Sequence, residues 1–305
     1  MFKTAGGLVA LATVLLLAPS ASAQPIEIEH AQGTTTLDAV PQSVMVTDWA
    51  AFDNLDALGI EVIEGVPASA TPPYLAGRVP ADAQAIGSLQ EPDIEGIAAA
   101  DPDLVIVASR SRTSYPMLSG IAPTIDLTVD NHDLIAGVEA NITRLGAIFD
   151  REERAGELVA ALDAKVEEAR AAAEGKGTGL VIVTNAGRLG VYGPGSRVAW
   201  IYDALGVPSV FDDVDDSDHG GDAISFEYLL ETNPDWLFVV DRDAGVGGEG
   251  AARALLDNDL IHETGFWQND RIIYLDPAAA YVTMHGYSGL MVLLDQVIAG
   301  YEDAS

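Results

Sequence analysis

The chain contains no cysteine among its 305 residues. This absence excludes disulfides, iron–sulfur clusters, thiolate zinc sites and cysteine nucleophiles. Basic residues are scarce as well, with 15 Lys and Arg against 47 Asp and Glu and a formal net charge of −32. Nucleic-acid binding needs a basic surface, so nucleic acid is excluded as a partner, and binding to anionic lipid is disfavoured for the same reason.

Long apolar runs are missing beyond the N-terminus. The first 23 residues combine Lys3, an apolar stretch from Gly7 to Leu17 and the small residues Ala21-Ser22-Ala23, a pattern typical of a secretory signal peptide. No later segment reaches the roughly 18 consecutive apolar residues of a membrane span. A lipid anchor at the cleavage site would need a cysteine. We therefore expect a mature chain that is free in the periplasm.

The most informative feature present is an internal repeat. The segment EGIAAADPDLVIVASR at 95–110 matches EYLLETNPDWLFVVDR at 227–242 in the order of its parts. Each begins with Glu, continues through a short helical pattern and an Asp/Asn-Pro-Asp turn, and ends with an apolar run and Arg. Upstream, DALGI at 56–60 matches DALGV at 203–207. A repeat with so long a period predicts two similar lobes rather than a solenoid.

The continuous Val, Ile and Leu runs predict an α/β fold whose sheets are mainly parallel and flanked by helices. Between the lobes, residues 151–175 are rich in Ala, Glu, Leu and Arg, with apolar residues at helical spacing. A single α-helix there would be about 36 Å long and stiff. We predict a signal peptide at 1–23, an N-terminal lobe at 24–150, a connecting helix at 151–175 and a C-terminal lobe at 176–305.

Two arginines occupy matching places in the repeat. Arg110 and Arg242 each follow the carboxyl end of a predicted strand, where parallel sheets bind ligands. If the lobes face each other, both arginines converge on one cleft, which suits an anionic ligand. The alternative for each is an ion pair with a neighbour such as Asp241 or Asp243.

Other candidate sites are weaker. The segment Gly245–Gly250 fits G-x-G-x-x-G, but it does not directly follow its strand, and Asp243 and Glu249 would repel a pyrophosphate. It predicts a flexible loop instead. His219 and His285 with an acidic residue would suit a bare zinc or manganese ion, although scattered histidines are more often surface residues.

Two aromatic residues are placed near the predicted cleft. Tyr281 follows Asp276-Pro277 just beyond the last strand, where its phenol oxygen is a suitable hard ligand for Fe³⁺. More commonly, the ring of such a tyrosine is packed in the core and its hydroxyl is hydrogen-bonded to a neighbour. Trp49 follows the first strand of the N-terminal lobe, where both a place in the cleft wall and a place in the core fit the pattern.

The block from Ser225-Phe226-Glu227 through Asn233-Pro234-Asp235 to Asp241-Arg242 resembles the ferric-siderophore periplasmic binding proteins of ABC transporters. Further matches are GSLQEPD at 87–93, IAPT at 121–124 and GSR at 195–197. The resemblance covers essentially the whole mature chain and is strongest to the petrobactin- and anguibactin-type group. It implies the class III binding-protein fold, in which one long helix joins two lobes.

In that family, arginines of both lobes hold an anionic iron chelate. The resemblance implies this role for Arg110, Arg197 and Arg242, with Arg112 as a second residue able to take the role of Arg110. It also implies that His219 and Tyr281 are direct ligands of the siderophore-bound iron.

We therefore expect a periplasmic binding protein, not an enzyme, that captures a ferric catecholate or mixed-type siderophore and delivers it to an inner-membrane ABC permease. We expect a monomer with no intrinsic cofactor, in which Fe³⁺ enters only as part of the ligand. Within the same fold, haem, cobalamin and free metal ions are the alternative ligands. An enzyme acting on an anionic substrate in the cleft is the alternative of a different class.

Overall fold

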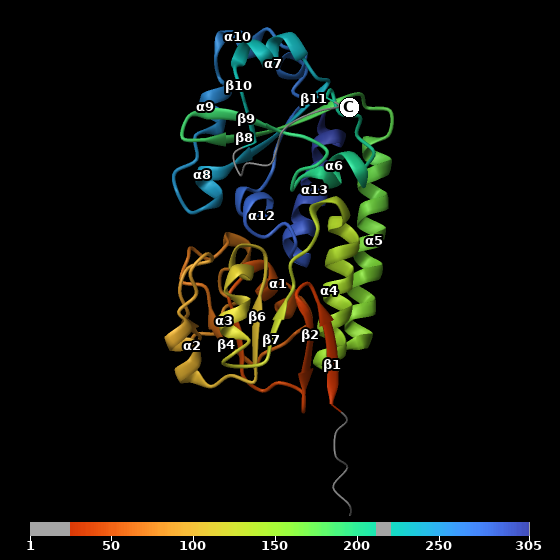
Figure 1. The fold of residues 1–305 in the computed structure, drawn as a ribbon. Coiled ribbons are helices and arrows are strands. Elements are labelled where there is room, and N and C mark those ends of the chain that lie inside the picture. The colour runs from red at the N-terminus through yellow and green to blue at the C-terminus, as the bar shows by residue number, and fades with distance from the viewer. Residues whose placement is uncertain (1–24, 212–220, 305) are drawn as a thin grey trace, which may run out of the picture.

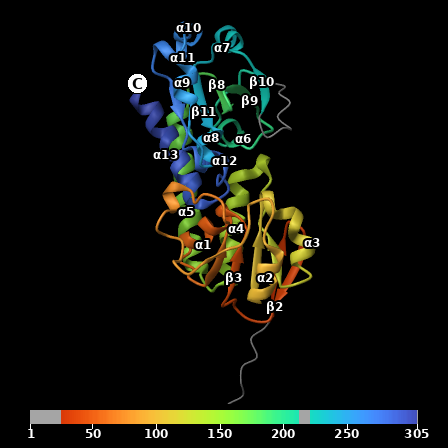
Figure 2. The ribbon, with the colours of Figure 1, turned by 90° about the vertical axis from the view of Figure 1, so that its left-hand side faces the viewer.

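A computed structural model describes residues 25–211 and 221–304 of the chain. Two lobes lie one above the other, and a long helix, α5 (Glu152–Ala173), runs along both of them (Figures 1 and 2). This is the class III binding-protein architecture expected from the sequence. The helix buries Leu158, Leu162 and Val166 on one face, which confirms the helical spacing of those residues.

The N-terminal lobe is built on a five-stranded sheet in the order β5-β4-β3-β6-β7, with every pairing parallel. Its strands are β3 (Val44–Val46), β4 (Ile63–Val66), β5 (Gln84–Ala85), β6 (Leu104–Val107) and β7 (Thr124–Asp126). Its helices are α1 (Trp49–Ala57), α2 (Ile94–Ala100), α3 (Tyr115–Leu118) and α4 (Leu134–Ile148), with 3₁₀ turns η1 (Pro73–Leu75), η2 (Ser109–Ser114) and η3 (Asn131–Asp133). A separate hairpin, β1 (Ile26–His30) and β2 (Gly33–Leu37), precedes them.

The sheet of the C-terminal lobe has the order β10-β9-β8-β11-β12. Its strands are β8 (Gly179–Asn185), β9 (Arg188–Tyr192), β10 (Asp222–Ile224), β11 (Trp236–Asp241) and β12 (Ile272–Tyr274). Its helices are α6 (Ala199–Asp203), α7 (Phe226–Thr232), α8 (Arg242–Gly245), α9 (Ala252–Leu256), α10 (Asp259–His262), α11 (Gly265–Gln268), α12 (Pro277–Tyr281) and α13 (Tyr287–Asp303).

This second sheet differs from the expected pattern in one respect. Strand β9 is antiparallel to both β8 and β10, whereas β8, β11 and β12 are parallel as predicted. The cause is a two-residue turn at Ala186 and Gly187, both with positive φ, which returns the chain directly beside β8. The sequence Asn185-Ala186-Gly187 contains the signal for this turn. A prediction based only on the apolar runs on either side does not detect it.

The internal repeat has a structural explanation. Asp101 and Asn233 end α2 and α7 in the left-handed conformation, which Asp and Asn tolerate better than most residues. Two residues further on, the Asp103 carboxylate accepts hydrogen bonds from the backbone N–H groups of Gln42 and Ser43, and Asp235 accepts one from that of Thr178. In both lobes the motif therefore fixes the chain that enters the first strand of the sheet.

The lobes are also joined by the last helix. Although α13 follows the C-terminal lobe in sequence, it lies along α5 and its start packs against α1 of the N-terminal lobe. The chain thus crosses between the lobes three times, along α5, in the segment between α12 and α13, and along α13 itself. Within the described residues, no helix is both long enough and apolar enough to cross a membrane.

Candidate functional site

Tyr281 lies at the centre of the interface between the lobes. It is the last residue of α12, and its side chain is buried. The guanidinium carbons of Arg110, Arg197 and Arg242 lie 5.3, 4.8 and 5.4 Å from the centroid of its ring. Three cations therefore surround one aromatic ring, at distances typical of cation–π contacts.

The three arginines come from both lobes. Arg110 belongs to η2, which follows β6 in the chain, and Arg242 is the first residue of α8, which follows β11. Arg197 lies between β9 and α6. Because parallel strands present their carboxyl ends at one edge of a sheet, the repeated position of Arg110 and Arg242 brings them to facing edges. The convergence expected from the sequence is therefore present.

Hydrogen bonds hold these side chains in place. Arg110 Nη2 donates to the Tyr281 carbonyl oxygen at 2.8 Å, and Arg197 Nη1 donates to the same oxygen at 3.3 Å. Arg242 Nε donates to the Tyr281 hydroxyl at 2.9 Å. The carbonyl lies at the C-terminus of α12, where the helix dipole favours positive charge. The residue proposed as an iron ligand is thus also the anchor of the arginines.

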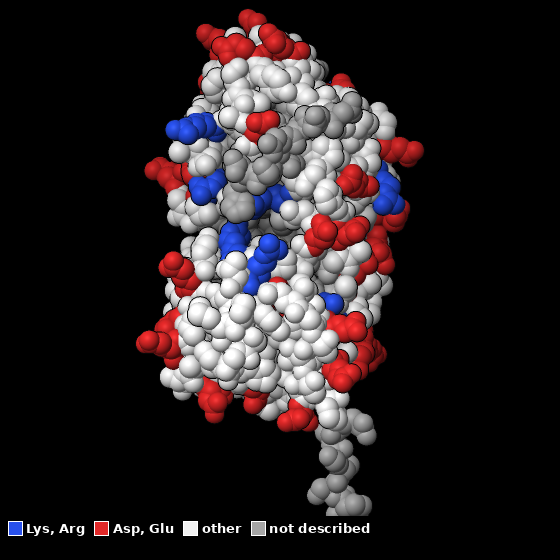
Figure 3. Space-filling model, viewed as in Figure 1, with Lys and Arg blue, Asp and Glu red and all other residues white. Residues whose placement is uncertain are grey.

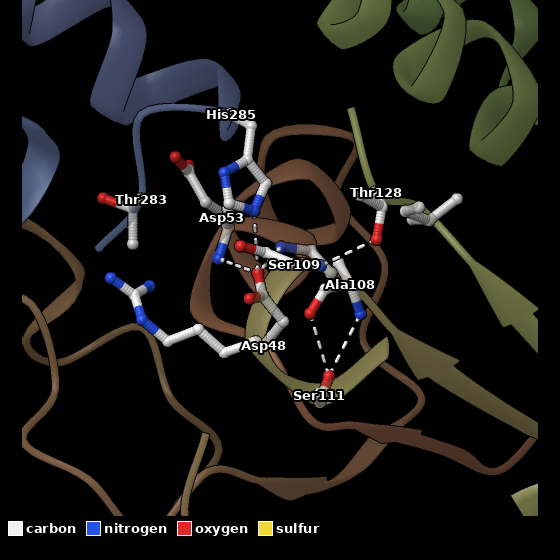
Figure 4. A network of polar contacts seen from close by, with 12 residues as sticks. Asp48, Asp53, Ala108, Ser109, Ser111, Thr128, Thr283 and His285 are labelled. Carbon is white, nitrogen blue, oxygen red and sulfur yellow. Dashed lines mark hydrogen bonds and ion pairs between the residues drawn. The ribbon is translucent and has the colours of Figure 1, made fainter. Parts of the chain in front are cut away.

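The turn that carries Arg110 is held by hydroxyl groups. Ser109 has a φ of 46° and donates its backbone N–H to Thr128 Oγ1 at 2.8 Å. Ser111 Oγ accepts from the N–H of Ala108 at 3.1 Å and donates to the carbonyl of the same residue (Figure 4). A strained backbone position of this kind persists only where its surroundings fix it. The direction in which Arg110 projects is therefore set by the N-terminal lobe.

The electrostatics favour an anionic ligand. Burial, followed by the positive charge of Arg197, lowers the pKa of Arg110, and the nearby Asp48 carboxylate opposes this shift. An anion between the arginines would relieve their mutual repulsion. On the face shown in Figure 3, Lys and Arg gather in the middle of the waist between the lobes, whereas Asp and Glu are spread over both lobes and along the edges of the molecule. The side chains at the cleft are thus mainly positively charged, whereas the protein as a whole carries a net negative charge.

Two cavities open on either side of Arg110 and Tyr281. One, of about 410 Å³, is lined by both residues together with Arg112, Arg197, Thr128 and His285, among others. The second, of about 390 Å³, is lined by Arg110, Tyr281, Arg242, Leu89 and Val246, among others. Arg110 and Arg112 both line the first of these cavities. The combined space suits a small-molecule ligand rather than a polymer.

Trp49, a further expected site residue, does not line either cavity. The Trp49 side chain is 1% exposed, packs edge-on against Phe52 and donates its indole N–H to Ser69 Oγ at 2.9 Å. It belongs to the core rather than to the cleft surface, because the first turn of α1 directs it inward. His219 falls outside the described residues.

His285 also lines the cleft. The sequence pointed to this residue only as part of a site for a bare metal ion. His285 is buried, lines the 410 Å³ cavity and has its Nε2 atom 3.3 Å from Asp48 Oδ1 (Figure 4). Asp48 in turn accepts the N–H groups of Ala50 and Ala51 at the start of α1. Asp48 lies two residues beyond the end of β3. The position after a strand end, which pointed to Arg110, would therefore also have pointed to Asp48.

The described residues include no group of three or more His, Asp or Glu side chains arranged to hold a metal ion. Tyr281 is the one proposed iron ligand within them, and Arg242 occupies its hydroxyl from one side.

Comparison with known proteins agrees with this geometry. Residues 44–279 match the family model described as periplasmic binding protein, and the chain belongs to that family. It is 33% identical over 283 residues to the petrobactin-binding protein YclQ of Bacillus subtilis, an alignment that covers 92% of this chain and 89% of that one. It is also 33% identical over 285 residues to the ferric-anguibactin-binding protein FatB of Vibrio anguillarum, covering 91% of this chain and 88% of FatB.

Solved structures show the same fold. The crystal structure of YclQ superposes with a TM-score of 0.87 over 92% of this chain and 99% of YclQ. The periplasmic catecholate-siderophore binding protein VctP of Vibrio cholerae superposes with a TM-score of 0.83, at 33% identity, over 92% of this chain and all of VctP. The α/β fold with one long connecting helix is therefore that of the family.

Proposed function

We propose that this protein binds an anionic ferric siderophore, of catecholate or mixed type, in the cleft between its lobes and delivers it to an inner-membrane ABC permease. The observation that carries the proposal is the convergence of Arg110, Arg197 and Arg242 on Tyr281 from both lobes. Three similar proteins support it by their names, since YclQ is a petrobactin-binding protein, FatB a ferric-anguibactin-binding protein and VctP a catecholate-siderophore binding protein.

The charge of such a ligand matches the cleft. A tris-catecholate ferric complex is trianionic, and three arginines balance that charge. At an effective dielectric constant of about 20, each charge pair at 4 Å contributes on the order of 4 kcal/mol before the cost of desolvation. The planar guanidinium group also matches paired oxygen atoms, as found in catecholates and carboxylates, better than an ammonium group does.

Direct contact with iron is a separate part of the proposal. A chelator that fills all six coordination positions leaves none for the protein, whereas a tetradentate chelator leaves two. We assign these positions to the Tyr281 hydroxyl and to His219. Arg110, Arg112, Arg197 and Arg242 would then contact the chelator itself.

The remaining features of the proposal concern the cell. The N-terminal segment 1–23 is assigned as a signal peptide, and the mature protein is assigned to the periplasm, as a monomer without a lipid anchor or a resident cofactor. Membership of a family of binding proteins supports binding without turnover. Catalysis on an anionic substrate would contradict this assignment.

Titration of tryptophan fluorescence tests the ligand class. Ferric catecholate complexes should quench the emission with a dissociation constant below about 1 μM. Haem, cobalamin and bare Zn²⁺, the alternative ligands for this fold, are titrated in the same way and should bind much more weakly. Equal or tighter binding of any of these three would refute the siderophore assignment. Recovery of the unchanged complex after incubation would separate binding from turnover.

A further inference from the structure

The glycine-rich loop Gly245–Gly250, which does not have the setting of a nucleotide site, lies at the edge of the cleft. Backbone N–H groups of Val246, Gly247 and Gly248 donate to the carbonyl groups of Arg242, Ala244 and Asp243. The Asp241 carboxylate accepts from the N–H of Ala244 before the loop and from that of Ala252 after it. The loop is therefore an ordered element fixed at both ends.

Its first glycine is packed against the centre of the binding site. A Cβ atom at Gly245 would lie 2.5 Å from the carbonyl oxygen of Pro277 and 3.1 Å from Cβ of Tyr281. The missing side chain lets the loop lie directly on α12. The position of the loop is thus tied to that of Tyr281.

The middle of the loop touches the opposite lobe. Gly247 has a φ of +86°, and a Cβ atom there would lie 2.9 Å from Cβ of Ala70 in the N-terminal lobe. That distance is too short for two carbon atoms. Ala70 is itself held in place, because the neighbouring Ser69 accepts the indole N–H of Trp49. The gap between the lobes at this point is therefore set by a glycine that faces an alanine.

Between these two contacts, the loop presents an apolar side chain to the cleft. Val246 is 50% exposed and, with Leu89, Ala70 and Val282, forms the apolar part of the 390 Å³ cavity. The other large apolar side chains that are exposed in the described part of the chain, Met117 and Ile121, do not line this cavity. Arg110 and Arg242 form its cationic part. A ligand that fills it needs an anionic region beside an apolar one.

We propose that the Gly247–Ala70 contact and Val246 form a specificity-determining wall, which limits the width of the apolar part of the ligand while the arginines hold its anionic part. This inference rests on the proposed function for the identity of the ligand. The contact itself does not depend on any ligand.

The first experiment tests the contact alone. Because the chain has no cysteine, the double variant Ala70→Cys/Gly247→Cys holds a single possible disulfide. Disulfides need Cβ atoms about 3.5–4.5 Å apart, which a small separation of the lobes at this edge provides. We expect mild oxidation to close the bond within one chain, seen by mass spectrometry of the peptides. Persistence of both free thiols would overturn the proposed wall, even if ferric siderophores bind.

The second experiment tests specificity. It uses two synthetic hexadentate ferric complexes of equal charge, one with catechol arms and one with bulkier 2,3-dihydroxynaphthalene arms. Gly247→Ala should hold the lobes apart at this edge, so the ratio of the two affinities should shift toward the bulkier complex by about fivefold or more. Gly77→Ala is the matched control, because Gly77 has a φ of +81° and open space around its Cβ position.

A reciprocal exchange isolates the cause. In the double variant Ala70→Gly/Gly247→Ala, one methyl group again faces a glycine, so the affinity ratio should return toward that of the natural protein. An unchanged ratio in Gly247→Ala, or no recovery in the exchange variant, would overturn the inference. If the natural protein binds neither complex, the proposed function fails, whereas the disulfide result still reports on the contact.

Discussion

The carboxylate of Asp53 in α1 accepts the backbone N–H of Gly289 in α13 at 2.9 Å, and this contact joins a helix of the N-terminal lobe to the helix that follows the C-terminal lobe. The N–H of Ser288 reaches the same carboxylate at 3.2 Å, so Asp53 caps a helix that follows the other lobe in sequence. The adjacent Asn54 accepts the N–H of Tyr287. The joint between the lobes is thus double, with α5 as one part and this cap as the other.

Asp53→Asn should destabilise the protein. The substitution keeps the size of the side chain but replaces one of two buried oxygen atoms, which accept two backbone N–H groups and the Tyr74 hydroxyl, by an amide group that donates. We expect a loss of about 1–3 kcal/mol in the free energy of unfolding, measured by urea denaturation. Asp56→Asn, at a more exposed position on the same helix, is the control and should change stability much less. Equal effects of the two variants would refute the role of the cap.

Closure of the lobes on ligand should be small. A stiff helix and a capped helix both cross between the lobes, and both resist bending more than a coil would. Small-angle X-ray scattering should therefore give nearly the same radius of gyration with and without a ferric catecholate. A large compaction on addition of ligand would contradict this expectation.

Arg242→Ala should weaken the binding of every anionic ferric siderophore. It removes a charged hydrogen-bond donor from the cleft, which corresponds to about 1.5–3 kcal/mol of binding free energy. Arg253→Ala is the matched control, because Arg253 stacks on Tyr274 outside the cleft cavities. Fluorescence titration measures both. Loss of affinity in the control alone, or in both equally, would argue against a special role for Arg242.

Tyr281→Phe should act selectively. A tetradentate ferric complex leaves positions for the phenol oxygen, so this variant should bind it more weakly and lose a phenolate-to-iron charge-transfer band in the visible spectrum. A hexadentate complex leaves no such position and should be affected little. If neither affinity nor spectrum changes with the tetradentate complex, Tyr281 is not an iron ligand and the arginines alone hold the chelate.

Glu139 should make stability depend on pH. Partial burial, followed by the hydrogen bond to Asp163 and its negative charge, raises the pKa of Glu139 to about 7. A raised pKa means that the folded protein binds a proton that the unfolded chain releases. The resulting stabilisation is complete at pH below the ordinary pKa of glutamic acid and is lost as the pH rises through about 7.

Glu139→Gln should remove this dependence. Because the side chain is partly exposed, we expect a gain of no more than about 1 kcal/mol at pH 8 and little change at pH 5. Thermal unfolding of the variant and the natural protein at both pH values measures the difference. A larger gain at pH 5 than at pH 8 would show that the sign is wrong.

The sequence predicts much of the fold because its strongest signals are local and repeated. The turns at Asp101 and Asn233 and the apolar face of α5 depend on residues close together in the chain. The convergence of Arg110 and Arg242 follows as well, because the geometry of parallel sheets turns a repeated position into a shared edge.

Features that depend on packing between distant segments could not be predicted. The side of the first turn on which Trp49 lies depends on the rotation of α1 against the sheet. The approach of His285 to Asp48, and of Gly247 to Ala70, depends on how closely the two lobes meet. No local sequence pattern predicts the distance between residues of the two lobes.

The carbonyl oxygen that receives Arg110 and Arg197 belongs to the main chain, and every amino acid has one. Substitution of Tyr281 changes what the side chain offers to a metal but leaves this acceptor in place. The proposed metal contact of Tyr281 and its role as acceptor for two arginines are therefore separable by mutation. Under the proposed function, a change in codon 281 would alter the preferred coordination of the cargo while two of the three cations keep their anchor.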